Sequence, residues 1–162
     1  MILIALGANL PSPAGPPRAT LEAALHELRR RNISVPARSN FYKSRAWPDP
    51  REPCFINAVA EIEAKQTPRE LLVLMREIEI MFGRTITRRN APRTLDLDLL
   101  DYNGLVEAGT PILPHPRLQE RAFVLVPLSD VAPDWRHPVS GLGVRTLIAA
   151  LPSEATALTK LP

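Results

Sequence analysis

The chain is short of cysteine and of long hydrophobic runs, and each shortage excludes a class of protein. Its single cysteine, Cys54, excludes an intramolecular disulfide, so we expect a protein of the reducing cytoplasm. No apolar run approaches the roughly 20 residues that span a bilayer. The apolar start of the chain is too short for a signal peptide and lacks the basic residues of one. We therefore expect no membrane partner.

The low charge and the low aromatic content argue against a nucleic-acid-binding surface. The formal net charge is only +3, and aromatic residues make up 5% of the chain. Proteins that bind a phosphate backbone need broad positive charge, and readers of single-stranded RNA need aromatic side chains on which bases stack. We expect small-molecule substrates and no nucleic acid.

The length of 162 residues fits one domain, which we assign to residues 1–162. Proline is abundant, with 18 residues, which is about twice average usage. These prolines are spread along the chain, so we expect stiff connections between short elements. We expect the protein to be a monomer.

The hydrophobic pattern predicts an α+β protein. A capping box at Thr67–Glu70, with proline at the first helical position, marks one helix start. The predicted order is strand, helix, strand, strand, helix, strand, over Met1–Leu6, 17–31, Ile33–Tyr42, Phe55–Ile62, Thr67–Gly83 and Thr94–Tyr102. This βαββαβ order is ferredoxin-like, an antiparallel sheet with two helices on one face. A C-terminal extension follows, with further helices expected near Leu118–Ser129 and Val144–Leu151.

The last predicted strand of this core carries two aspartates on one face. Leucine at positions 95, 97 and 99 alternates with Asp96 and Asp98, which is the two-residue period of a strand. Alternate side chains lie roughly 6.6 Å apart, so two such carboxylates can hold one divalent ion or a pair of ions. Asp101 breaks the parity, so we expect it on the other face or out of the strand end, and we do not count it as a ligand.

Four arginines precede the aspartates in a segment without acidic residues, at positions 84, 88, 89 and 93. An isolated pair of acids on a strand is more often simply solvated. Guanidinium groups bind phosphate oxygens, whereas carboxylates bind Mg²⁺. The combination therefore indicates a polyphosphate held together with Mg²⁺.

Several stretches together resemble the 6-hydroxymethyl-7,8-dihydropterin pyrophosphokinase family of folate biosynthesis. The matching stretches occur in the family's order and spacing, from about residue 1 to about residue 135. They are GANL at 7–10, FINAV at 55–59, GR at 83–84, PRTLDLDLL at 92–100, PHPR at 114–117 and RAFVL at 121–125. The PRTLDLDLL run is highly specific, whereas GANL or PHPR alone would be weak.

The resemblance implies transfer of a pyrophosphoryl group from ATP, as co-substrate, to the hydroxymethyl group of a reduced pterin, with release of AMP. It implies two Mg²⁺ ions held by Asp96 and Asp98, with Arg84 and Arg93 completing the catalytic set. The residues that it places at ATP are Glu79, Arg84, Arg93, His115 and Arg121. The residues expected at the pterin are Ser44, Trp47, Phe55, Asn57 and Phe123, with the ring between the two phenylalanines and Asn57 at its polar edge.

The chain departs from the family pattern at three places, one of which is the altered proline-glycine pattern at 42–48. The usual GSNL is GANL here, so the serine hydroxyl is missing. The loop before PRTLDLDLL is about one residue shorter and has Asn90 and Ala91 where members commonly carry an aromatic residue. We expect this loop, bounded by Gly83 and Pro92, to close over ATP and exclude water.

Two other functions fit part of the pattern. A two-metal phosphodiesterase would use the same aspartates, but such sites gather further carboxylates or histidines, and the chain has three histidines. A non-catalytic RNA-binding domain would use the sheet of a ferredoxin-like fold. In that case Asp96 and Asp98 would repel the phosphate backbone.

Overall fold

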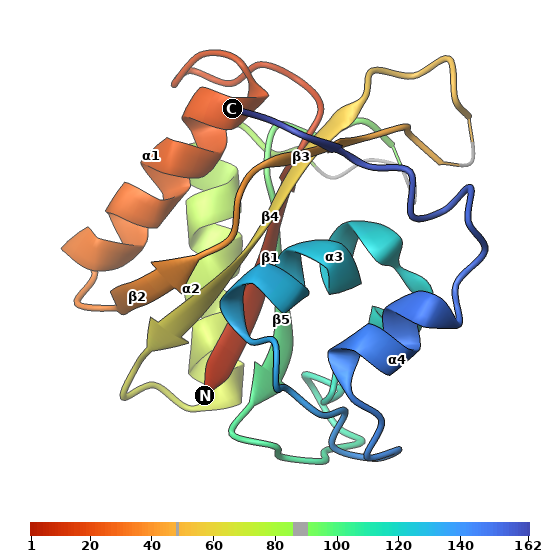
Figure 1. Ribbon diagram of the computed structural model, residues 1–162. Coiled ribbons are helices and arrows are strands. Elements are labelled where there is room, and N and C mark those ends of the chain that lie inside the picture. The colour runs from red at the N-terminus through yellow and green to blue at the C-terminus, as the bar shows by residue number, and fades with distance from the viewer. Residues whose placement is uncertain (48, 86–90) are drawn as a thin grey trace.

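A computed structural model describes residues 1–47, 49–85 and 91–162, and its centre is an antiparallel sheet. Within these residues the sheet has six strands in the order β5-β1-β4-β3-β6, and β2 also pairs with β4. Their bounds are β1 Ile2–Ala8, β2 Ser34–Arg38, β3 Tyr42–Ser44, β4 Phe55–Glu63, β5 Asp96–Tyr102 and β6 Thr159–Lys160. Figure 1 shows β1 between β5 and β4. The predicted ferredoxin-like βαββαβ core is confirmed.

The two helices of this core begin where the sequence predicts. Helix α1 spans Pro17–Arg30, and α2 spans Pro68–Met81. The capping box of α2 is formed: Glu70 N donates to Thr67 Oγ1 over 3.4 Å, and Thr67 N donates to the Glu70 carboxylate over 2.8 Å. Gly83 follows α2 with a φ of 86°, the left-handed conformation that glycine adopts without strain.

Helices cover both faces of the sheet (Figure 1). On one face, Ile4 and Leu6 of β1 and Leu97 of β5 pack in the core formed with α1 and α2. On the other, Leu3 and Leu100 pack in a second core with α3 Ala122–Val131 and α4 Val144–Ala149. The extension therefore forms a second layer, which the prediction of helices on one face did not include. Alternation along β1 explains both cores, since successive side chains point to opposite faces.

The prediction of one continuous strand over Ile33–Tyr42 was wrong, because the structure has two strands there, β2 and β3, separated by a break. At the break, Ser39 N donates to Val59 O over 2.9 Å, and Val59 N donates to the Ser39 hydroxyl over 3.0 Å. Asn40 N donates instead to Asp130 of α3 over 3.1 Å. A side-chain acceptor thus replaces the regular backbone ladder for these residues.

The prediction that Asp101 points away from the face of Asp96 and Asp98 was also wrong. The pairing of β1 with β5 shifts register between Leu3 and Ile4, so Leu3 is opposite Asp101 whereas Ile4 is opposite Leu99. This bulge inserts one residue and returns Asp101 to the face of Asp98. Asp101 is buried there and accepts a hydrogen bond from Trp135 Nε1 over 2.7 Å. This buried hydrogen bond gives Asp101 a structural role, in keeping with the prediction that it is not a metal ligand.

The C-terminal third differs from the prediction in detail. The helix expected near Leu118–Ser129 is a 3₁₀ turn, Leu118–Glu120, followed by α3, with Arg121 extended between them. Strand β6 was not predicted; it pairs with β3 through Tyr42 and Lys43. Among the helices of the described residues, none is both long and apolar enough to cross a membrane.

Candidate active site

A cavity of about 500 Å³ opens on the face of the sheet that carries the aspartates. Nine of the residues singled out from the sequence line it: Ser44, Trp47, Phe55, Asn57, Arg93, Asp96, Asp98, Arg121 and Phe123. The other three, Glu79, Arg84 and His115, lie beside it and contact the aspartates or their partners. The structure therefore brings the predicted residues together from five separate stretches of the chain.

The floor of the cavity is built by small residues on the central strand. Gly7 pairs with both Asp96 and Asn57, and Ala5 pairs with Asp98. A β carbon on Gly7 would lie 3.4 Å from Asn57 Oδ1 and 3.8 Å from the Phe55 ring. Small side chains at these positions leave space above the sheet, and the alternation of β5 turns both carboxylates into that space.

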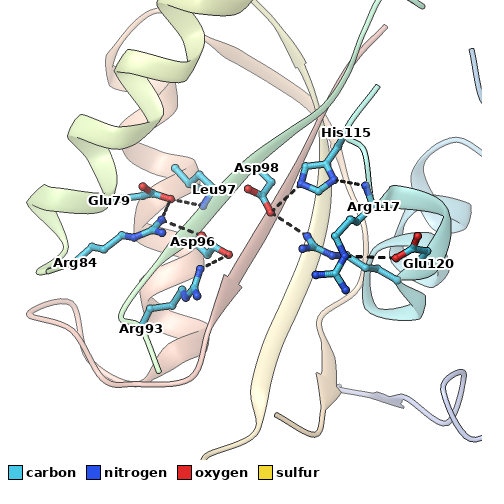
Figure 2. Close-up of polar contacts among 10 residues, drawn as sticks. Glu79, Arg84, Arg93, Asp96, Leu97, Asp98, His115, Arg117 and Glu120 are labelled. Atoms are coloured by element: carbon cyan, nitrogen blue, oxygen red, sulfur yellow. Dashed lines mark hydrogen bonds and ion pairs between the residues drawn. The ribbon is translucent and has the colours of Figure 1, made fainter. Parts of the chain in front are cut away.

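Asp96 is held by two arginines. Arg84 Nη1 lies 2.9 Å from Asp96 Oδ1, and Arg93 Nη1 lies 3.0 Å from Asp96 Oδ2 (Figure 2). Each carboxylate oxygen therefore has its own guanidinium partner. A phosphate group entering the cavity would meet cationic groups that are already aimed at anionic oxygen atoms.

Asp98 lies in a less favourable environment for its charge. Arg121 Nη1 is 3.4 Å from Asp98 Oδ2, and His115 Nε2 is 3.9 Å from the same oxygen. Burial, together with the negative charge of Asp96, raises the pKa of Asp98 to about 6. Two carboxylates that project from β5 into the same cavity form a suitable site for a divalent cation.

His115 is neutral over the ordinary pH range. Burial and the nearby positive charge of Arg121 lower its pKa to about 4. Its Nδ1 atom accepts a hydrogen bond from Arg117 N over 3.2 Å (Figure 2). The proton of the neutral ring is therefore assigned to Nε2, the nitrogen that faces Asp98.

Glu79 is buried behind Arg84, on the last turns of α2. Its Oε1 atom accepts hydrogen bonds from Leu97 N, over 2.7 Å, and from Arg84 Nη1 (Figure 2). Burial raises the pKa of Glu79 to about 7, against the opposing effect of these two donors. The carboxylate thus joins α2 to β5 through one backbone group and one cation.

The other half of the cavity is aromatic and polar. Phe55 and Phe123 both line it, and neither belongs to the two buried cores. Asn57 is buried and donates to the Ser44 hydroxyl over 2.8 Å. Trp47, which is 66% exposed, lies at the rim. This half has the flat faces and the hydrogen-bonding groups that suit a heteroaromatic ring.

Asn9 had no predicted role, and the structure shows it to be a structural support of the site. Asn9 Oδ1 accepts from Arg93 N over 2.8 Å, and Asn9 Nδ2 donates to Pro53 O over 3.0 Å. It ties the end of β1 to the residue that holds Asp96. The GANL stretch was the available signal, because an asparagine directly after a strand commonly bonds to backbone groups.

Further cavity residues were not singled out from the sequence. Glu154 and Ala155, near the end of the chain, line the cavity and belong to no motif, and Arg117 of the PHPR stretch and Glu120 line it as well. Arg88, Arg89 and the expected closure of their loop lie outside the described residues, as does position 48.

Comparison with known proteins agrees with this geometry. A model of the 7,8-dihydro-6-hydroxymethylpterin-pyrophosphokinase (HPPK) family matches residues 3–133. The 2-amino-4-hydroxy-6-hydroxymethyldihydropteridine pyrophosphokinase of Synechocystis is 40% identical over 148 residues, which cover 90% of this chain and 73% of the relative. The protein of that name from Pseudomonas aeruginosa is 37% identical over 162 residues, covering 99% of this chain and 96% of the relative.

A solved structure shares the fold. The crystal structure of Plasmodium falciparum HPPK-DHPS with pteroate aligns with a TM-score of 0.71 at 13% sequence identity. The alignment covers 91% of this chain, which spans 43% of that longer chain. With a family model matching most of its length, and relatives near 40% identity, the chain belongs to the 7,8-dihydro-6-hydroxymethylpterin-pyrophosphokinase family.

Proposed function

We propose that the protein transfers the pyrophosphoryl group of ATP to the hydroxymethyl group of 6-hydroxymethyl-7,8-dihydropterin, giving the pterin diphosphate and AMP in folate synthesis. The observation that carries the proposal is one cavity with two unlike halves. Paired aspartates and arginines line one half, and Phe55, Asn57 and Phe123 line the other. A phosphate donor and a flat acceptor can therefore lie side by side in it.

Asp96 and Asp98 are the residues that would hold Mg²⁺. Both side chains are partly exposed to the cavity, and Mg²⁺ in phosphoryl-transfer sites takes one or two carboxylates together with substrate phosphates and water. Mg²⁺ bound there would neutralise phosphate charge and help to align the reacting oxygens. The raised pKa of Asp98 supports this assignment, because a bound cation relieves the repulsion between the two carboxylates.

The cationic residues around the aspartates would bind the phosphates. Arg84 and Arg93 have their guanidinium groups on Asp96, and Arg121 has its own on Asp98, so all three face the same space. When a nucleotide binds, each guanidinium could replace its aspartate partner with a phosphate oxygen and so remain paired with an anion. His115, with its proton on Nε2, would donate a hydrogen bond to the nucleotide without adding charge. Glu79 would lie near the nucleotide but behind Arg84, out of direct contact with it.

The acceptor would be positioned by stacking and by one polar edge. Phe55 and Phe123 would pack against the two faces of the pterin, and Asn57, held by Ser44, would bond to its edge. Trp47 would form the outer wall and reduce the entry of water. No strong general base is required, because phosphoryl-type transfer depends mainly on positioning and charge neutralisation.

The structure gives less support to the two other functions. Among the described residues, no group of three or more histidine, cysteine or acidic side chains is placed to hold a metal, as a phosphodiesterase site would require. An RNA-binding sheet needs an exposed face, whereas α1 and α2 cover one face and α3 packs against β4 on the other.

The single domain, the monomeric state and the cytoplasmic location remain predictions. Size-exclusion chromatography tests the monomeric state.

The test is incubation with MgATP and hydroxymethyl-dihydropterin, with chromatographic detection of AMP and the pterin diphosphate. We expect both products in equal amounts. Asp96→Ala and Asp98→Ala should abolish turnover and leave the circular dichroism spectrum unchanged. Glu22→Ala, in an exposed surface pair with Arg18, is the matched control and should retain full activity. Near-normal turnover in either aspartate variant would refute the metal assignment.

A further inference from the structure

Glu79 has the most deeply buried side chain of the sequence-predicted ATP residues. Its side chain is 6% exposed, and it is absent from the cavity lining. Its Oε1 atom is shared by the Leu97 N–H and Arg84 Nη1. Among the described residues, any effect of Glu79 on a ligand in the cavity therefore has to pass through one of these two partners.

Arg84 is shared between a buried and an accessible carboxylate. Its Nη1 atom lies between Glu79 Oε1 and Asp96 Oδ1, the latter at 2.9 Å. Asp96 is more exposed and has a second partner, Arg93, so it can exchange Arg84 for another cation at small cost. Glu79 cannot, because a buried carboxylate that loses its cation is strongly destabilised. Of the two contacts, the one to Glu79 is the more durable.

We propose that Glu79 is a positioning residue that keeps Arg84 beside the metal and phosphate site when Asp96 exchanges its arginine for a cation. Glu79 keeps its hydrogen bond to Arg84 Nη1, and the guanidinium, once released by Asp96, can donate to a phosphate oxygen. The inference rests on the proposed function, since it requires a nucleotide and a cation at this site.

A purely structural role is the competing explanation. Glu79 also bonds to Leu97 N, so it could simply fasten α2 to β5. The two roles separate in Glu79→Gln, because the carbonyl oxygen of glutamine still accepts from Leu97 N. The substitution removes the negative charge that holds the guanidinium. A structural role predicts unchanged nucleotide binding in this variant, and the positioning role predicts weaker binding.

The experiment is a double-mutant cycle on nucleotide affinity, measured without turnover. A non-hydrolysable ATP analogue with Mg²⁺ is titrated by calorimetry at pH 8.5, where Glu79 is ionised, into the wild type, Glu79→Gln, Arg84→Ala and the double variant. We expect Glu79→Gln to weaken binding about tenfold, which is the effect of losing a charge-assisted hydrogen bond. In the Arg84→Ala background, adding Glu79→Gln should change the affinity by less than about twofold, because its only route to the ligand is gone.

The matched control is Glu77→Gln on the same helix. Glu77 forms an exposed pair with Arg31 at 2.6 Å, and its loss should leave affinity unchanged. If Glu79→Gln fails to fold, as circular dichroism would show, Glu79→Asp replaces it, because it keeps the charge and shortens the reach by one methylene.

Equal affinity in Glu79→Gln and the wild type would overturn the inference. Independent, additive losses in the double variant would overturn it as well, because Glu79 would then act by a route other than Arg84. A wild type that binds no nucleotide would instead overturn the proposed function, and the inference with it. The two failures are thus distinguished by the first titration.

Discussion

Asp98→Asn should make the protein more stable while removing its activity. The carboxyl of Asp98 has an ordinary pKa of 3.8, which burial and the charge of Asp96 raise to about 6 in the folded protein. Above pH 6 the folded state therefore holds a charge that the unfolded state carries more easily. Below pH 3.8 the group is protonated in both states and the penalty disappears.

The size of this effect follows from the pKa. The rise to about 6 corresponds to at most about 3 kcal/mol of the free energy of unfolding. Because the Asp98 side chain is 34% exposed, solvent screening reduces this to about 1–2 kcal/mol. For a chain of 162 residues, that is a gain of about 2–8 °C in Tm.

The assay is thermal unfolding by circular dichroism at pH 8 and at pH 4, with a chelator present to remove divalent cations. We expect Asp98→Asn to melt above the wild type at pH 8, and the two to converge at pH 4. Asp130→Asn is the matched control, and we expect it to change the melting temperature in the opposite direction. Burial opposes the charge of Asp130, but hydrogen bonds from Asn40 and Tyr42 outweigh it and lower its pKa, so this variant should melt below the wild type. An Asp98→Asn variant that melts at or below the wild type at pH 8 would show that the reasoning is wrong.

Three further predictions concern other parts of the site and its support. His115, whose pKa is lowered to about 4 by burial and Arg121, should show no protonation above pH 5 in an NMR titration; a midpoint near 6.5 would contradict this. Gly7→Val should raise the KM for the pterin about tenfold and leave the KM for ATP nearly unchanged, because the new side chain enters the cavity beside Asn57. Equal increases in both constants would contradict that placement. Asp101→Ala should lower the free energy of unfolding by about 1–3 kcal/mol, measured with urea, because it leaves the Trp135 N–H unpaired; both KM values should stay unchanged, and a shifted KM would count against a purely structural role.

The parts of the fold that follow from local pattern were predictable. Leucine at 95, 97 and 99 alternates with Asp96 and Asp98, and such alternation places the carboxylates on one face whatever the strand pairs with. The capping box at Thr67 likewise specifies the start of α2 from four adjacent residues. The two aspartates and the α2 helix were therefore placed correctly from short segments.

The parts that failed depend on pairing between distant segments. Asp101 returns to the face of Asp98 only because β1 pairs with β5 through a bulge at Leu3 and Ile4. Ser39 ends β2 only because its hydroxyl bonds to Val59, twenty residues away. Neither partner can be read from the local sequence. The register of a strand depends on the strands it pairs with, and this explains why the face of Asp101 and the end of β2 were both predicted wrongly.

The same reason explains the cavity residues that no motif indicated. Glu154 reaches the cavity because β6 pairs with β3, which brings the last part of the chain beside Ser44. Glu79 reaches Leu97 N because α2 packs on β5, whereas its contact with Arg84 is local, across five residues. Family resemblance predicted Glu79 as a site residue, and only the packing of α2 on β5 shows its contact with Leu97.

The chain's two tryptophans lie in opposite surroundings, and this makes the protein convenient for fluorescence. Trp47 is 66% exposed at the cavity rim with the Arg117 guanidinium 5.8 Å from its ring, whereas Trp135 is 8% exposed and bonded to Asp101. A Trp135→Phe variant would leave a single emitter at the mouth of the cavity, accessible to a quencher until a ligand covers it. In the unchanged chain, the inner tryptophan would signal loss of packing, so one spectrum would separate occupancy from unfolding.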